Sequence, residues 1–175
     1  MRFQGGRDKA TGAGNAGRLV ACPAPGRAIR RKEGAHMRLL FYSNALTTTP
    51  TGHHSKSHSA GLTVLLLHDR PCGVDVELVR ERAFTVSRWY PPQEREPRLR
   101  LQYLLWTRRE ALYKLLCSEG TPLHFRQLLG RPVYEGGLVE TVGGVRYCTR
   151  WLRCKRQSYV VSTAVRPQAA GDARA

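Results

Sequence analysis

The stretch Cys72-Gly73-Val74-Asp75-Val76-Glu77 decides most of what the sequence says about the fold. Its valines alternate with its two acids, and a β-strand points successive side chains to opposite faces. We therefore predict a strand over 73–78 that buries Val74 and Val76 and carries both carboxylates on its other face. Two hard oxygen ligands then point to the same side of a sheet.

The second informative stretch is Trp106-Thr107-Arg108-Arg109-Glu110-Ala111-Leu112-Tyr113-Lys114. Glu110 and Lys114 are four residues apart, so on a helix they lie one above the other. We predict a helix that begins near 97 and ends at Gly120, and the leucines expected to form its core stripe are Leu101, Leu105, Leu112 and Leu116. Trp106, Glu110 and Lys114 are expected on a different face.

Together the two stretches supply the groups that hold a divalent metal against a phosphate. Magnesium prefers oxygen ligands and takes only a few from protein, which leaves positions for water and substrate phosphates. Asp75, Glu77 and Glu110 suit such an open site. Taken singly, an Asp-x-Glu strand is most often a solvated face and a Glu–Lys helical pair is usually a surface pair. Their occurrence in one chain favours the metal site.

A third stretch, Ser57-His58-Ser59-Ala60-Gly61, precedes an apolar run over 62–67 and is expected to be a loop that offers hydroxyls, amides and an imidazole to a phosphate. In the order Ser-His-Ser, Gly-Val-Asp-Val-Glu and Trp-x-x-[Lys/Arg]-Glu-Ala-x-x-Lys, the set resembles the 4′-phosphopantetheinyl transferases of the surfactin-synthetase-activating type. The resemblance covers roughly residues 50 to 165, and the third motif is the most specific. Much of the first half of these larger two-half enzymes is missing or rebuilt here.

The resemblance implies transfer of the 4′-phosphopantetheine arm of coenzyme A to a serine of an acyl or peptidyl carrier protein, with release of adenosine 3′,5′-bisphosphate. Magnesium is the implied metal. The implied site consists of the metal ligands Asp75, Glu77 and Glu110, the coenzyme A contacts Ser57, His58, Ser59, Arg109 and Lys114, and the catalytic residues Glu94, Glu110 and Lys114. His58, with Ser57 and Ser59 beside it, would contact the 3′-phosphate end of coenzyme A. Glu94, in Tyr90-Pro91-Pro92-Gln93-Glu94, would be the base or the partner of a metal-bound water. Lys114 would contact phosphate and protonate the leaving group. Arg109 stands where the family commonly has lysine, and its planar guanidinium is not equivalent to an ammonium.

The expected fold is α+β, an antiparallel sheet with one long helix packed on it, as in the transferase family. A strand is predicted over 62–67, and the turn over 68–71 is expected to join it to the 73–78 strand as its partner. Further strands are predicted over 145–154 and 158–165, joined across 155–157, with a helical turn over 123–129 and a loop over 47–55. Residues 1–36 are expected to be a disordered basic leader or a misplaced start, and 167–175 a disordered tail. The transferase-like domain then spans 37–166, with a reduced first half over 37–79 and a second half over 80–166.

The net charge of +16 leaves further functions open. The first 36 residues carry eight Lys or Arg against two acids, so more than half of the excess lies in the rest of the chain. A basic surface attracts a polyanionic cofactor and an acidic carrier protein, and equally a nucleic acid. The arginines and lysine that support nucleic-acid binding are Arg98, Arg100, Arg108, Arg109, Arg146, Arg150, Arg153, Lys155 and Arg156. The acidic residues are also compatible with a metal-dependent phosphoesterase, and the short first half with an inactive transferase relative.

Cysteine and histidine usage narrows the class of protein further. The five cysteines are odd in number and include no Cys-x-x-Cys pair, which argues against a disulfide framework. His53, His54, His58 and His68 lie near Cys72, but their spacing matches no common zinc arrangement. No apolar run is long enough to span a membrane, so we expect a cytoplasmic protein without a membrane partner, as a monomer or small homo-oligomer.

Overall fold

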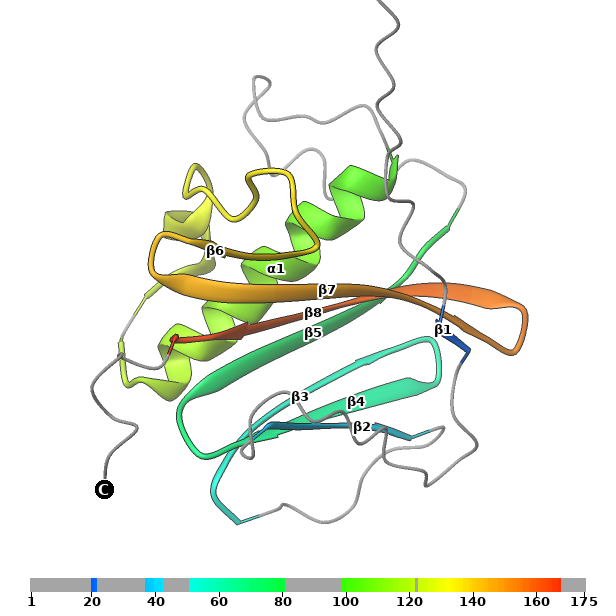
Figure 1. The fold of residues 1–175 in the computed structure, drawn as a ribbon, viewed down its shortest axis with the longest axis horizontal. Helices are drawn as coiled ribbons and strands as arrows, with labels where there is room; N and C mark the ends of the chain where they lie inside the picture. Colours follow the sequence, from blue (N-terminus) through cyan, green and yellow to red (C-terminus); the bar gives the residue numbers. More distant parts are fainter. Residues whose placement is uncertain (1–19, 22–36, 43–50, 81–98, 122, 168–175) are drawn as a thin grey trace, which may run out of the picture.

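A computed structural model describes residues 20–21, 37–42, 51–80, 99–121 and 123–167, and within them it contains two β-sheets and one long helix (Figure 1). The large sheet has the order β1 (Val20–Ala21), β7 (Val145–Cys154), β8 (Gln157–Val165) and β5 (Cys72–Leu78), and β6 (Val139–Val142) also pairs with β7. The small sheet has the order β2 (Met37–Tyr42), β4 (Leu62–His68) and β3 (His53–Ser59). The helix α1 spans Leu99–Ser118 and is followed by the short 3-10 helix η3 (Phe125–Leu128).

Two apolar clusters separate three layers. The first lies between the sheets, where Val74 and Val76 of β5 pack with Phe41 and Val64 of the small sheet. The second lies between α1 and the other face of the large sheet, and it includes Ala111, Leu115, Val145, Tyr147 and Ala164. Figure 1 shows α1 running along the large sheet, with the small sheet beside β5. The predicted α+β class is confirmed, and the valines of β5 are buried as the alternation required.

Gly73 lets α1 approach β5 closely. A Cβ atom added at this position would lie 1.8 Å from the carbonyl oxygen of Ala111 and 2.7 Å from the amide nitrogen of Leu115. Only glycine avoids this collision with the helix backbone. The close approach brings the middle of α1 against the face of β5 that carries Asp75 and Glu77.

Most predicted elements are confirmed. The strands β4, β5, β7 and β8 and the helix α1 form where the sequence predicted them, within one or two residues at the described ends. Lys155 and Arg156 make the turn between β7 and β8, and both have positive φ angles, 46° and 67°. Such a two-residue turn with two positive φ angles matches the twist of the strands that it joins. Residues 97 and 98 lie outside the described residues.

Several predictions of local structure are wrong. The Ser57-His58-Ser59 stretch is part of β3 rather than a loop, and residues 53–55, also expected in a loop, belong to the same strand. The strands β4 and β5 are not partners, since β4 pairs with β2 and β3 whereas β5 pairs with β8. Three further strands were not predicted: β2, β6 and the short β1. The strand β1 pairs parallel with β7 and lies inside the segment expected to be disordered.

The predicted core stripe of α1 is also wrong in part. Leu112 and Leu116 are buried, but Leu101 and Leu105 are only half-buried, and the buried face instead includes Leu104, Thr107, Arg108, Ala111 and Leu115. A sequence pattern does not reveal this face because two of its members are polar. Their polar groups have partners: Thr107 Oγ1 lies 2.8 Å from Ser162 Oγ, and the Arg108 guanidinium organises a loop.

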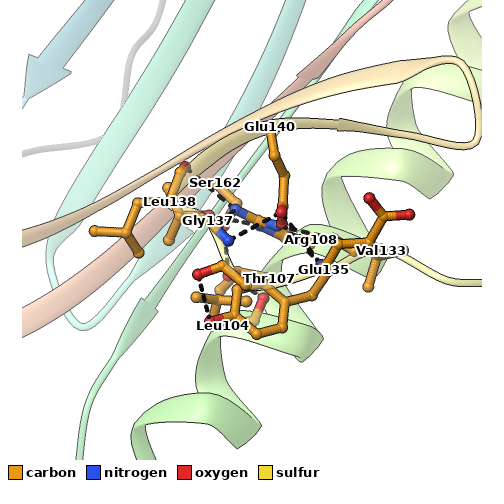
Figure 2. A network of polar contacts seen from close by, with 12 residues as sticks. Leu104, Thr107, Arg108, Val133, Glu135, Gly137, Leu138, Glu140 and Ser162 are labelled. Atoms are coloured by element: carbon orange, nitrogen blue, oxygen red, sulfur yellow. Dashed lines mark hydrogen bonds and ion pairs between the residues drawn. The ribbon is translucent and has the colours of Figure 1, made fainter. Parts of the chain in front are cut away.

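Arg108 is 0% exposed and lies at the centre of the polar network in Figure 2. Its guanidinium pairs with Glu140, donates to Thr149 Oγ1 at 2.8 Å, and also donates to the carbonyl oxygens of Val133, Gly137 and Leu138. Burial alone would raise the pKa of Glu140, but hydrogen bonds from the Gly137 amide and Arg108 hold it below its usual value. A buried arginine needs such a full set of acceptors, so Arg108 fixes the 133–140 segment against α1.

No helix among the described residues is both long and apolar enough to cross a membrane.

Candidate functional site

Residues from the three sequence motifs meet where α1 crosses β5. Lys114 Nζ donates hydrogen bonds to Asp75 Oδ1 at 2.7 Å and to the carbonyl oxygen of Val74 at 3.1 Å. Ser57 Oγ, from β3, donates to the same Asp75 oxygen at 2.7 Å. Asp75 is only 4% exposed, so its carboxylate is enclosed by a helix and two strands.

Burial raises the pKa of all three carboxyl groups in this site, and the charge of Asp75 adds to the shift of the other two. Burial raises the pKa of Asp75, and this effect outweighs the ammonium of Lys114 and the hydroxyl of Ser57. Burial and the charge of Asp75 raise the pKa of Glu77. Burial, followed by the charge of Asp75, raises the pKa of Glu110 to about 7. The effect of the Asp75 charge on both glutamates places the carboxylates of both motifs in one cluster, and shifted pKa values concentrate at functional sites.

Three serines connect β3 to the open edge of β5. The Oγ atoms of Ser55, Ser57 and Ser59 accept hydrogen bonds from the backbone amides of residues 74, 76 and 78, at 2.9, 3.3 and 3.0 Å. The constant offset of 19 residues means that the two strands run in the same direction. Side-chain hydroxyls therefore occupy the edge of β5 where a neighbouring strand would otherwise supply carbonyls. We name this set the serine ladder.

Two members of the serine ladder also reach the carboxylates. Ser57 donates to Asp75, as described above, and Ser59 Oγ donates to Glu77 Oε2 at 3.2 Å. Trp106 donates a further hydrogen bond to Glu77. From the sequence we expected the serines to contact a phosphate, and we predicted no polar role for Trp106. The Ser-x-Ser-x-Ser alternation over 55–59 was the available signal, because it has the two-residue period of a strand.

An aromatic group borders the cluster on the α1 side. The ring of Phe125 lies 5.1 Å from the ring of Trp106 and 5.7 Å from the ring of Tyr113, measured between centroids. Separations in this range are typical of favourable aromatic pairs. All three rings are half-buried, so η3 packs against the same helix face that carries Glu110.

The remaining predicted residues lie elsewhere. His58 is exposed on the face of β3 opposite Ser57 and Ser59, and therefore points away from the carboxylate cluster. Arg109 is 6% exposed, and its charge acts on Tyr147 of β7. Glu94 lies outside the described residues. The structure thus brings together Ser57, Ser59, Asp75, Glu77, Glu110 and Lys114, and it puts His58 on another surface.

The cluster fits magnesium in its donor chemistry but not in its present arrangement. Within the described residues, no three His, Cys, Asp or Glu side chains are positioned to hold a metal ion as they stand. Lys114 Nζ instead lies against Asp75 Oδ1. The second oxygen, Asp75 Oδ2, is buried without a hydrogen-bond partner, which is costly for a carboxylate and leaves an acceptor for a cation. Oxygen donors on one side of β5 are the ligands that magnesium prefers.

Two of the residues that supported nucleic-acid binding are buried. Arg108 and Arg109 are buried and cannot contact a nucleic acid in this fold. Arg146, Arg153, Lys155 and Arg156 are exposed on β7 and the β7–β8 turn. Arg98 lies outside the described residues.

Comparison of the chain with models of protein families and with curated protein sequences gave no match. The resemblance to the 4′-phosphopantetheinyl transferases therefore rests on the three sequence motifs alone.

Proposed function

We propose that the chain is a magnesium-dependent 4′-phosphopantetheinyl transferase, which transfers the phosphopantetheine arm of coenzyme A to a serine of an acyl or peptidyl carrier protein. The observation that carries the proposal is the ion pair between Lys114 and Asp75, 39 residues apart in sequence, inside a cluster that includes Glu77 and Glu110. The acidic motif and the helical motif of the family resemblance thus meet at the buried carboxylate of Asp75.

The reaction needs few protein groups. The hydroxyl oxygen of the carrier serine attacks the phosphorus next to pantetheine, and the bond to the bridging oxygen of the pyrophosphate breaks. Adenosine 3′,5′-bisphosphate leaves, and the serine proton passes to a base. Positioning and electrostatic stabilisation supply most of the catalysis in such transfers, so no nucleophile of the enzyme is required.

Named residues of the chain suit each role. Glu94, outside the described residues, is the candidate base. Glu110 acts in catalysis as a ligand of the metal. Lys114 supplies the proton and positive charge for the leaving phosphate, and its side chain is already held at the cluster by Asp75 and Val74.

Magnesium would be held by Asp75, Glu77 and Glu110, and when bound it would neutralise charge on the pyrophosphate oxygens. Asp75 Oδ2, which is buried without a hydrogen-bond partner, is the oxygen available to the metal, while the ammonium of Lys114 lies on Oδ1. The carboxylate cluster would then gain a second cation. The raised pKa values of these carboxyl groups mean that their charges are costly to bury without such a partner.

The basic surface suits the proposed partners. Coenzyme A is a polyanion and carrier proteins present acidic surfaces to their enzymes, so a chain with a net charge of +16 would attract both. We place the protein in the cytoplasm, as a monomer or small homo-oligomer, without a membrane partner.

The test is the intact mass of an apo carrier protein incubated with the chain, coenzyme A and magnesium. We expect a mass gain of one phosphopantetheine group that is lost without metal and strongly reduced in Glu110→Gln. Glu119→Gln is the matched control, because Glu119 lies just beyond α1 and pairs with Arg166 at 2.9 Å, apart from the cluster.

The outcomes separate the competing functions. A mass gain that survives in both Glu110→Gln and metal-free reactions would refute the role of the carboxylate cluster. No gain on several carrier proteins, combined with detectable coenzyme A binding, would favour an inactive relative. If coenzyme A binding is also absent while nucleic acid binds and Arg153→Ala weakens that binding, the transferase proposal is wrong.

A further inference from the structure

We infer that Ser57 and Ser59 are positioning residues for the metal-binding carboxylates rather than contacts for the 3′-phosphate of coenzyme A. This inference rests on the proposed function for its metal. It assigns the two serines from their own hydrogen bonds and departs from what the family resemblance implies for them.

Each of the two hydroxyls accepts one hydrogen bond from β5 and donates one to it. Ser57 Oγ accepts from the amide of Val76 at 3.3 Å and donates its only hydrogen to Asp75 Oδ1 at 2.7 Å. Ser59 Oγ accepts from the amide of Leu78 at 3.0 Å and donates its hydrogen to Glu77 Oε2 at 3.2 Å. A hydroxyl has one donor, so neither serine retains a hydrogen for a phosphate oxygen.

The same bonds restrain the carboxylates. The backbone amide fixes the position of each hydroxyl, and the hydroxyl then holds one carboxylate oxygen. For Asp75, Ser57 and Lys114 both occupy Oδ1, which leaves Oδ2 buried without a hydrogen-bond partner. Groups that orient a ligand in this way typically change metal affinity 10-fold to 100-fold when they are removed.

Ser55 provides a matched control within the same strand. Its Oγ accepts from the amide of Val74 at 2.9 Å, so it makes the same backbone contact to β5 as Ser57 and Ser59. Ser55 is as buried as Ser57, at 7% and 8% exposure, yet it donates no hydrogen bond to Asp75 or Glu77. Loss of the Ser55 hydroxyl therefore tests the strand contact alone.

The first measurement is the affinity of the full chain for magnesium alone, by titration calorimetry, together with the thermal unfolding midpoint. We expect Ser55→Ala and Ser57→Ala to lower the midpoint by similar amounts. Ser57→Ala should weaken magnesium binding about 10-fold or more, whereas Ser55→Ala should change it less than about 3-fold. Ser57→Thr, which keeps the hydroxyl, should restore most of the affinity.

The second measurement separates carboxylate positioning from phosphate contact. The transfer rate of each variant is compared with coenzyme A and with 3′-dephospho-coenzyme A, which lacks the 3′-phosphate. If Ser57 positions Asp75, the Ser57→Ala variant loses the same factor with both substrates. A loss confined to coenzyme A would overturn the inference and restore the phosphate contact.

The two proposals fail in different ways. If the unsubstituted chain binds magnesium but Ser55→Ala and Ser57→Ala weaken binding equally, the positioning role is wrong and the proposed function stands. If the unsubstituted chain binds no magnesium, the metal-dependent function is wrong, and the inference is wrong with it.

Discussion

Replacing Gly73 by alanine should separate α1 from β5 and damage both the fold and the carboxylate cluster. The new Cβ would lie 1.8 Å from the Ala111 carbonyl oxygen, whereas real Cβ atoms essentially never come closer than 3.0 Å to another heavy atom. The two backbones must therefore move apart by about 1.2 Å, since neither colliding group can rotate away. A similar displacement of Lys114 would lengthen its 2.7 Å bond to Asp75 beyond the limit of about 3.2 Å for such a bond.

Overpacking of a core typically costs about 1–3 kcal/mol, and a collision between two backbones belongs at the upper end. We expect Gly73→Ala to lower the free energy of unfolding in urea by about 3 kcal/mol, and the thermal midpoint by roughly 6–12 °C for a chain of this size. Magnesium affinity should fall as well. Gly137→Ala is the control, because its Cβ would lie 3.4 Å from Glu140 Oε2, an ordinary contact. Stability of Gly73→Ala within about 0.5 kcal/mol of the unsubstituted chain, with unchanged magnesium affinity, would refute the close approach of α1.

Three further predictions concern individual contacts. Arg108→Met should lower the free energy of unfolding in urea by about 3–5 kcal/mol, because Glu140 loses its buried partner, whereas the exposed Arg100→Met should cost less than about 1 kcal/mol. Equal costs would contradict the network. Because the pKa of Glu110 is raised, the native state holds a proton that the unfolded state releases, and the free energy of unfolding should fall as pH rises from 4.5 to about 7. Glu110→Gln should reduce this pH dependence, measured by urea unfolding at several pH values. An unchanged pH dependence would count against the raised pKa. Arg156→Gly should raise the free energy of unfolding by about 0.5–1 kcal/mol, and the thermal midpoint with it, since glycine adopts the positive φ of this turn without steric strain. A lower midpoint would argue against that turn.

The carboxyl-bearing strand could be predicted because its alternation is local. In β5 each valine is followed by an acid, and the two-residue period of a strand turns that order into two faces. The same reasoning, on the helical period, separated Glu110 and Lys114 from the buried Leu112 and Leu116, although it wrongly added Leu101 and Leu105 to the core stripe. These predictions needed only residues within one element.

The strand β3 could not be predicted in the same way, because its inner face is made of serines. A run of polar residues after Pro50 and Gly52 has the composition of a loop. Its stability as a strand comes from the apolar β4 beside it and from the hydroxyl bonds to β5, 19 residues further along the chain. The burial of Arg108 in α1 could not be predicted for a similar reason. The acceptors that make it possible lie 25 to 41 residues away in the sequence.

The order of residues is enough to establish which chemical groups the chain carries and how they are paired within an element: Asp75 with Glu77 on a strand, and Glu110 with Lys114 on a helix. The packing of the elements brings the two pairs together, turns Ser57 and Ser59 toward the acids, and turns His58 away. The physical reason is that periodicity acts over a few residues. The meeting of α1 and β5 depends on a missing Cβ at Gly73 and on contacts between segments 39 residues apart.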